Sequence, residues 1–119
     1  MDIEEKIDSS IVFARIHGTF EAVHQWSNAP EKQSYLRNIH RHLFVVTVEI
    51  EVTHDDREIE FYECKETLKG VLERMEKPLS FSCEQYAKQI YGMMAEIYGV
   101  RSMAINVLED GLEGAVVIF

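Results

Sequence analysis

The stretch from His40 to Val52 constrains the fold more than any other part of the chain. From His40 onward, every second residue is apolar or an imidazole, and most of the residues between are polar or charged. Side chains of a β-strand point alternately to its two faces, so the pattern predicts a strand with one buried face and one mostly solvated face. The buried face would carry His40, His42, Phe44, Val46, Val48, Ile50 and Val52.

The chain before this strand predicts one more long strand and a loop. Residues 10–24 are rich in β-branched and aromatic side chains, which favours a strand with a bulge at Gly18. Residues 25–39 contain several turn-forming residues and predict a long loop, and long loops in compact domains often carry function. Residues 1–8 are polar and acidic, and we expect them to be frayed or to lead into the first strand.

Two amphipathic helices are predicted after the central strand. Apolar residues at helical spacing cover residues 61–75, and Pro78 requires that helix to end. A second helix begins at Ser82, where Gln85 completes a capping box, and it ends at Gly99. Strands at 103–107 and 115–119 flank an Asp-Gly turn. Strands at both ends with helices between predict an α+β fold, with both helices covering one face of the sheet.

Length, charge and cysteine content limit the class of protein. At 119 residues, the chain is expected to form a single domain over residues 1–119. The 12 basic and 21 acidic residues argue against non-specific nucleic-acid binding, which needs a basic surface. No apolar run approaches the roughly 20 residues of a membrane helix. Cys64 and Cys83 form no Cys-x-x-Cys motif and no signal peptide is recognisable, so we expect reduced thiols in the cytoplasm.

Three of the five histidines have the right parity to meet on one face of the sheet. His40 and His42 share the apolar face of their strand, and His24 has the parity of Phe20 and Ala22. One interpretation is a zinc site with three protein ligands and an open position, which is typical of catalytic zinc. The other is a group of buried histidines that satisfy their hydrogen bonds within the core. Spacing alone leaves both interpretations open.

Several short motifs occur in an order that matches a known family. They are Phe-Glu-Ala-Val-His at 20–24, His-Arg-His at 40–42, Ile-Glu-Phe with Lys65 and Leu68, Ser-Cys-Glu at 82–84 and Val-Leu-Glu at 107–109. Together they resemble the 6-pyruvoyl-tetrahydropterin synthase / 6-carboxytetrahydropterin synthase family, from about residue 10 to the C-terminus. The resemblance implies the tunnelling fold (T-fold), with the element order ββααββ and a four-stranded antiparallel sheet. It also implies a homo-oligomer, a trimer or a hexamer.

The resemblance assigns roles to individual residues. It implies a zinc ion held by His24, His40 and His42, with Glu109 accepting hydrogen bonds from the N–H groups of a pterin. Glu84 matches the glutamate at the start of the family's second helix and is the second residue expected to bind substrate. The implied function is a lyase or synthase that acts on a dihydroneopterin-triphosphate-like substrate, in tetrahydropterin or queuosine-type deazaguanine biosynthesis.

The chain departs from the family at its acid–base residues. Leu36 stands where the family has its catalytic cysteine, and residues 74–80 lack the family's Asp-His pair. General acid–base catalysis is typically worth about 10²–10⁴ in rate, so the usual reaction should be impaired. Cys83, at a helix N-terminus, is the candidate replacement base, or else a small residue packed there; Glu31 and Tyr35 are further candidates. Two alternatives to an enzyme remain: a non-catalytic protein that binds zinc and a pterin or purine, and a metal-free structural protein.

Overall fold

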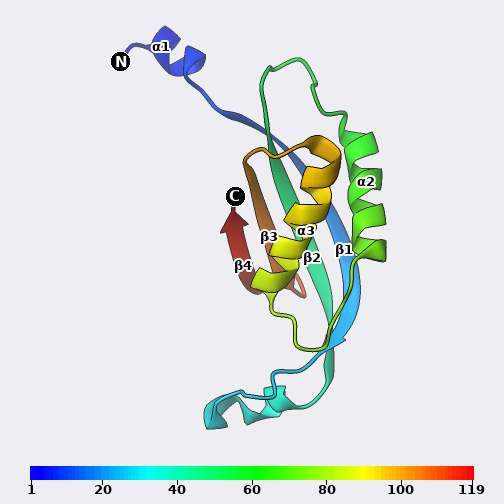
Figure 1. Ribbon diagram of the computed structural model, residues 1–119. Coiled ribbons are helices and arrows are strands. Elements are labelled where there is room, and N and C mark those ends of the chain that lie inside the picture. The colour runs from blue at the N-terminus through cyan, green and yellow to red at the C-terminus, as the bar shows by residue number, and fades with distance from the viewer.

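A four-stranded antiparallel sheet forms the framework of the structure, a computed structural model that describes residues 1–119 (Figure 1). Its strands lie in chain order: β1 (Val12–His24), β2 (His40–Val52), β3 (Met103–Glu109) and β4 (Glu113–Ile118). The helices are α1 (Ile3–Asp8), α2 (Phe61–Arg74) and α3 (Cys83–Tyr98), with a 3-10 segment η1 (Glu31–Arg37) between β1 and β2. The predicted α+β class and the antiparallel sheet are therefore confirmed.

Helices α2 and α3 cover one face of the sheet (Figure 1). Helix α2 packs against β1, and α3 packs against β3 and β4. The face of β2 that was predicted to be buried lies beneath them, and Phe44, Val46, Val48 and Ile50 are all fully buried in a cluster of 22 core residues. Helix α3 begins with the predicted capping box between Ser82 and Gln85. None of the helices has the combination of length and apolar character that crossing a membrane requires.

Two predictions about β1 and the segment before it are wrong. Residues 3–8 form helix α1, because the Asp2 side chain accepts a hydrogen bond from the Glu5 backbone at 2.8 Å and caps the first turn. The helix therefore precedes the expected ββααββ elements, and it lies apart from the rest of the molecule (Figure 1). Gly18 is not a bulge, because it pairs directly with Val46 in an unbroken register.

Gly18 instead provides space for α2. A Cβ atom at this position would lie 2.8 Å from Cδ1 of Leu72 and 3.1 Å from Cδ2 of Leu68. The absence of a side chain at Gly18 therefore allows the helix to approach the strand closely. Two residues expected on the apolar stripes of the helices are solvent-exposed instead: Phe61, at the start of α2, is 57% exposed, and Ile97, near the end of α3, is 51% exposed. Both lie in a terminal turn of their helix.

The loop between β1 and β2 extends from one end of the sheet (Figure 1). It contains η1, which was not predicted. Its base is fixed by backbone hydrogen bonds from Trp26 to the Leu36 carbonyl at 2.8 Å and from Gln25 to the Leu79 carbonyl at 2.9 Å. The loop leaves the sheet after His24 and rejoins it at His40, and these residues are two of the three predicted metal ligands.

Candidate metal centre

The three predicted histidines meet at this end of the sheet. The register places His24 directly opposite His40, and His42 lies on the same face one pleat further along β2. One ring nitrogen from each of the three lies within 4.8 Å of those of the other two. His24, His40 and His42 are therefore close enough together to hold a metal ion, as the strand parity predicted.

Hydrogen bonds at the far side of two rings fix their orientation. Nδ1 of His40 lies 2.8 Å from the Asn38 carbonyl oxygen, and Nδ1 of His42 lies 2.7 Å from Oδ2 of Asp110. A carbonyl and an ionised carboxylate can only accept hydrogen bonds, so in both rings Nδ1 carries the proton and donates it. The Nε2 atom of each neutral ring is then left with a free lone pair, which is the state that binds a metal ion.

Two ring nitrogens are buried without a hydrogen-bond partner. They are the Nε2 atoms of His24 and His42, whose side chains are 13% and 19% exposed. Such atoms are rare in folded proteins because an unpaired buried polar group costs free energy. A metal ion at this point would satisfy both of them, so the donor set fits a metal bound by neutral imidazoles. Histidines that served only as core residues would be expected to satisfy these nitrogen atoms with hydrogen bonds inside the protein.

The protonation of His24 also suits a ligand. Burial of the ring lowers its pKa, and the neighbouring His40 adds to this effect. The carboxylate of Glu109 and the backbone of Phe81 act in the opposite direction, but the net shift is downward. A lowered pKa keeps the imidazole neutral near pH 7, and only a neutral imidazole can coordinate a metal ion.

Glu109 places a carboxylate beside the three imidazoles. It ends β3 on the face that carries Val107, and its oxygens lie 3.7 Å from Nε2 of His24 and 3.6 Å from Nε2 of His42. These distances are too long for hydrogen bonds. The carboxylate therefore adds negative charge to the centre and keeps its acceptor positions free for a metal ion or a bound molecule.

A cavity of about 380 Å³ opens next to the centre. This volume is within the range of ordinary small-molecule sites. The cavity brings together four of the predicted site residues, and the aromatic residues Trp26 and Phe81 form part of its wall. The four are His24, Cys83, Glu84 and Glu109.

Cys83 lies in the cavity wall but is set up as a neutral thiol. Burial raises its pKa to about 11, and the carboxylates of Glu109 and Glu84 add to the effect. At neutral pH, the side chain is therefore protonated, in spite of its position in the first turn of α3. The role of Cys83 as replacement base stays a prediction. To act as a base, its thiol would first have to lose its proton. Glu84, in the same turn, is exposed to solvent at the cavity mouth.

Asp110 was not predicted to belong to the site. In the sequence, it reads as the first residue of an Asp-Gly turn, and the structure confirms the turn: Asp110 and Gly111 have φ values of 55° and 74°. What the sequence does not reveal is that the β2–β3 register places Asp110 next to Leu43, one residue from His42. Its position directly after the predicted site residue Glu109 was the only available signal.

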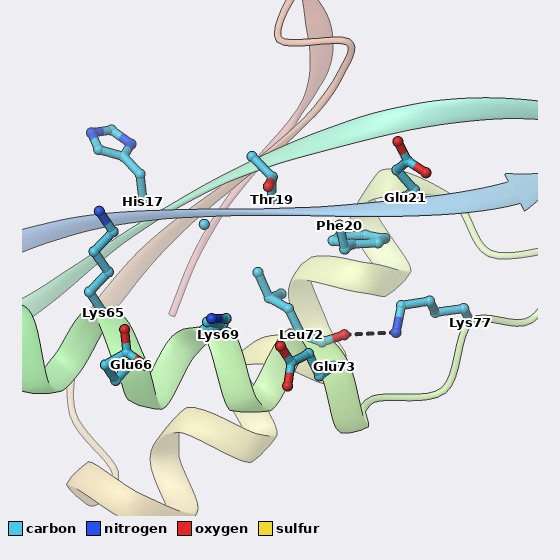
Figure 2. Close-up of a pocket in the computed structure, with 11 residues that line it drawn as sticks. His17, Thr19, Phe20, Glu21, Lys65, Glu66, Lys69, Leu72, Glu73 and Lys77 are labelled. Carbon is cyan, nitrogen blue, oxygen red and sulfur yellow. Dashed lines mark hydrogen bonds between the residues drawn. The ribbon is translucent and has the colours of Figure 1, made fainter.

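A second cavity, of about 420 Å³, lies between β1 and α2 (Figure 2). It contains none of the predicted site residues. Lys65, Lys69 and Lys77 contribute positive charge to its wall, but three glutamates also line it. Figure 2 shows the Lys77 amine donating a hydrogen bond to the Leu72 carbonyl, at 2.7 Å, at the end of α2. This cavity therefore offers no concentrated charge or metal-binding group comparable to the histidine centre.

Comparison with known proteins identifies no family. No protein-family model matches the chain, and no curated protein matches its sequence. The resemblance to the pterin synthases therefore depends on the motifs described above, and what it implies is a matter for proposal and experiment.

Proposed function

We propose that the chain binds a zinc ion through His24, His40 and His42 and belongs to the T-fold pterin synthases. The observation that carries the proposal is the convergence of three imidazoles, two of which have buried, unpaired Nε2 atoms. Imidazole ligands suit zinc, and three protein ligands are typical of a catalytic zinc site with one open position. Bound there, zinc would supply Lewis-acid chemistry toward substrate oxygens.

The proposed substrate is a dihydroneopterin-triphosphate-like molecule, and the proposed activity is that of a zinc-dependent lyase or synthase. Glu109 would hold the pterin by accepting hydrogen bonds from its N–H groups, because its oxygens make no hydrogen bonds to the nearby imidazoles. The cavity beside Glu109 has room for a bicyclic ring. Glu84 would contribute a second carboxylate at the cavity mouth. The pathway would be tetrahydropterin or queuosine-type deazaguanine biosynthesis.

The proposed assembly is a homo-oligomer, a trimer or a hexamer. The open edges of the sheet support it, because β1 and β4 each have only one neighbouring strand. On β4, the apolar side chains Val116 and Ile118 are 59% and 76% exposed, which favours burial against another copy of the chain.

A second candidate function is a non-catalytic protein that binds zinc and a pterin or purine. Leu36 replaces the family's catalytic cysteine, and burial raises the pKa of Cys83 to about 11, which favours the neutral thiol at neutral pH. These two observations favour binding without turnover. They leave the metal centre itself unaffected.

Metal analysis and one activity assay separate these functions. Protein purified without chelators should contain close to one zinc per chain, and His40→Ala should remove it. His17→Ala is the matched control, because His17 lies on the other face of β1 and contacts Thr47. A chain without zinc would contradict both functions and favour a metal-free structural role.

The assay follows release of inorganic triphosphate from dihydroneopterin triphosphate by the zinc-loaded protein. Turnover would support the enzyme, and tight pterin binding without turnover would support the binding protein. If turnover occurs, Cys83→Ala should abolish it. Unchanged turnover in that variant would remove Cys83 as the base.

A further inference from the structure

Asp110 links the turn after β3 to the strand that carries two of the three histidines. Its Oδ2 lies 2.7 Å from Nδ1 of His42, and its Oδ1 accepts a hydrogen bond from the Leu43 backbone at 3.1 Å. The backbone N–H of Asp110 donates in turn to the Leu43 carbonyl at 2.6 Å. Both carboxylate oxygens are therefore engaged, and one of them is directed at the ring of a metal ligand.

The backbone at Asp110 suits a hairpin turn, which accepts aspartate, asparagine or glycine at this position. Its φ of 55° lies in the left-handed region that these residues tolerate. Asparagine would also keep the hydrogen bond from Leu43. What only a carboxylate supplies is a pair of oxygens that both accept, one for the Leu43 backbone and one for the His42 ring.

We propose that Asp110 is a positioning residue that fixes the orientation and tautomer of His42 for metal binding. By accepting a hydrogen bond from Nδ1–H, the carboxylate keeps the proton on Nδ1 and leaves the Nε2 lone pair free to face His24 and His40. This is the arrangement in which a carboxylate supports a metal-bound histidine from behind and raises its basicity. The inference rests on the proposed metal site, but the state of the His42 ring can be tested without metal.

The decisive variant is Asp110→Asn. If the amide oxygen keeps the Leu43 bond, the amide nitrogen faces Nδ1 of His42 and donates to it. The ring must then carry its proton on Nε2, where it blocks metal coordination. Zinc affinity, measured by competition with a chromogenic chelator, should fall about 10–100-fold, the usual effect of losing such a partner. Asp56→Asn is the matched control, because Asp56 pairs only with the exposed Arg57.

The metal-free protein provides the second measurement. Long-range ¹H–¹⁵N NMR spectra should show His42 protonated on Nδ1 in the wild type and on Nε2 in Asp110→Asn, with unchanged thermal stability. A purely structural role for Asp110 would not exchange the tautomer. If the wild type binds zinc and Asp110→Asn binds it equally well, the inference is overturned and the metal proposal stands. If the wild type binds no zinc, the proposed function fails, and the NMR result alone decides how Asp110 acts on His42.

Discussion

The two ends of the sheet each gather ionisable side chains, but they differ in how completely these groups are hydrogen-bonded. At the end distant from the histidines, Glu58 accepts bonds from the backbone and hydroxyl of Thr53, both at 2.7 Å, and from Arg101 at 2.6 Å. At the other end, Nε2 of His24 and Nε2 of His42 have no partner at all. Both clusters bring together segments distant in sequence, but only the histidine cluster leaves ring nitrogens buried and unpaired.

Completeness of hydrogen bonding is the property that distinguishes the two clusters. The Glu58 cluster uses its acceptors within the protein, and this lowers the pKa of Glu58 from 4.5 to about 2. In the histidine cluster, the Nε2 atoms of His24 and His42 have no hydrogen-bond partner. One ring nitrogen of each of the three histidines lies within 4.8 Å of those of the other two. A set of buried lone pairs that nothing in the protein satisfies is a strong structural indication of a ligand.

The largest expected effect is stabilisation by zinc. At a free zinc concentration about 100 times the dissociation constant, the folded state should gain about 2.7 kcal/mol. The measurement is the urea midpoint with and without added zinc. The gain should disappear in His42→Ala and remain in Glu58→Gln, because only the first variant loses a metal ligand. Equal loss in both variants would show that the two ends do not differ as described.

A smaller effect is expected from His24→Leu in the metal-free protein. The substitution removes a buried nitrogen that lacks a partner, and leucine can pack against Phe44, whose ring centre lies 5.6 Å from that of His24. The free energy of unfolding, measured in the presence of a chelator, should rise by on the order of 1 kcal/mol. Arg101→Leu at the other end should lower it, because Glu58 loses a donor. A loss of stability in both variants would contradict the comparison.

The smallest effect concerns pH and the Glu58 cluster. Because its pKa is lowered in the folded protein, first by the Thr53 backbone, ionised Glu58 favours the folded state. This contribution is fully present above about pH 4.5 and is lost as the pH falls toward about 2. The stability difference between the wild type and Glu58→Gln should therefore be constant above that range and shrink within it. A difference that does not change between these limits would show that Glu58 is not held as described.

The sequence was sufficient to predict the features that depend on local periodicity. Alternation along β2 identified its buried face, and the shared parity of His24, His40 and His42 predicted that they would meet. The capping box at Ser82 and the Asp-Gly turn were also visible, because each depends on residues a few positions apart. The α+β class follows from the order of these elements.

The features that the sequence did not reveal depend on contacts between distant segments. The contact between Asp110 and His42 needs the register of β3 on β2, which no local pattern encodes. The space that Gly18 gives to α2 depends on how that helix packs. The raised pKa of Cys83 comes from burial and from the carboxylates of Glu109 and Glu84, and its position at a helix N-terminus does not reveal these effects.

The pairing of His24 with His40 has a consequence for the long loop between them. These residues face each other across the point where residues 25–39 leave and rejoin the sheet. A metal ion bound by both histidines would cross-link the two ends of this loop and restrict their conformations. Metal binding at the centre should then slow amide exchange and proteolytic cleavage around η1, compared with the metal-free protein.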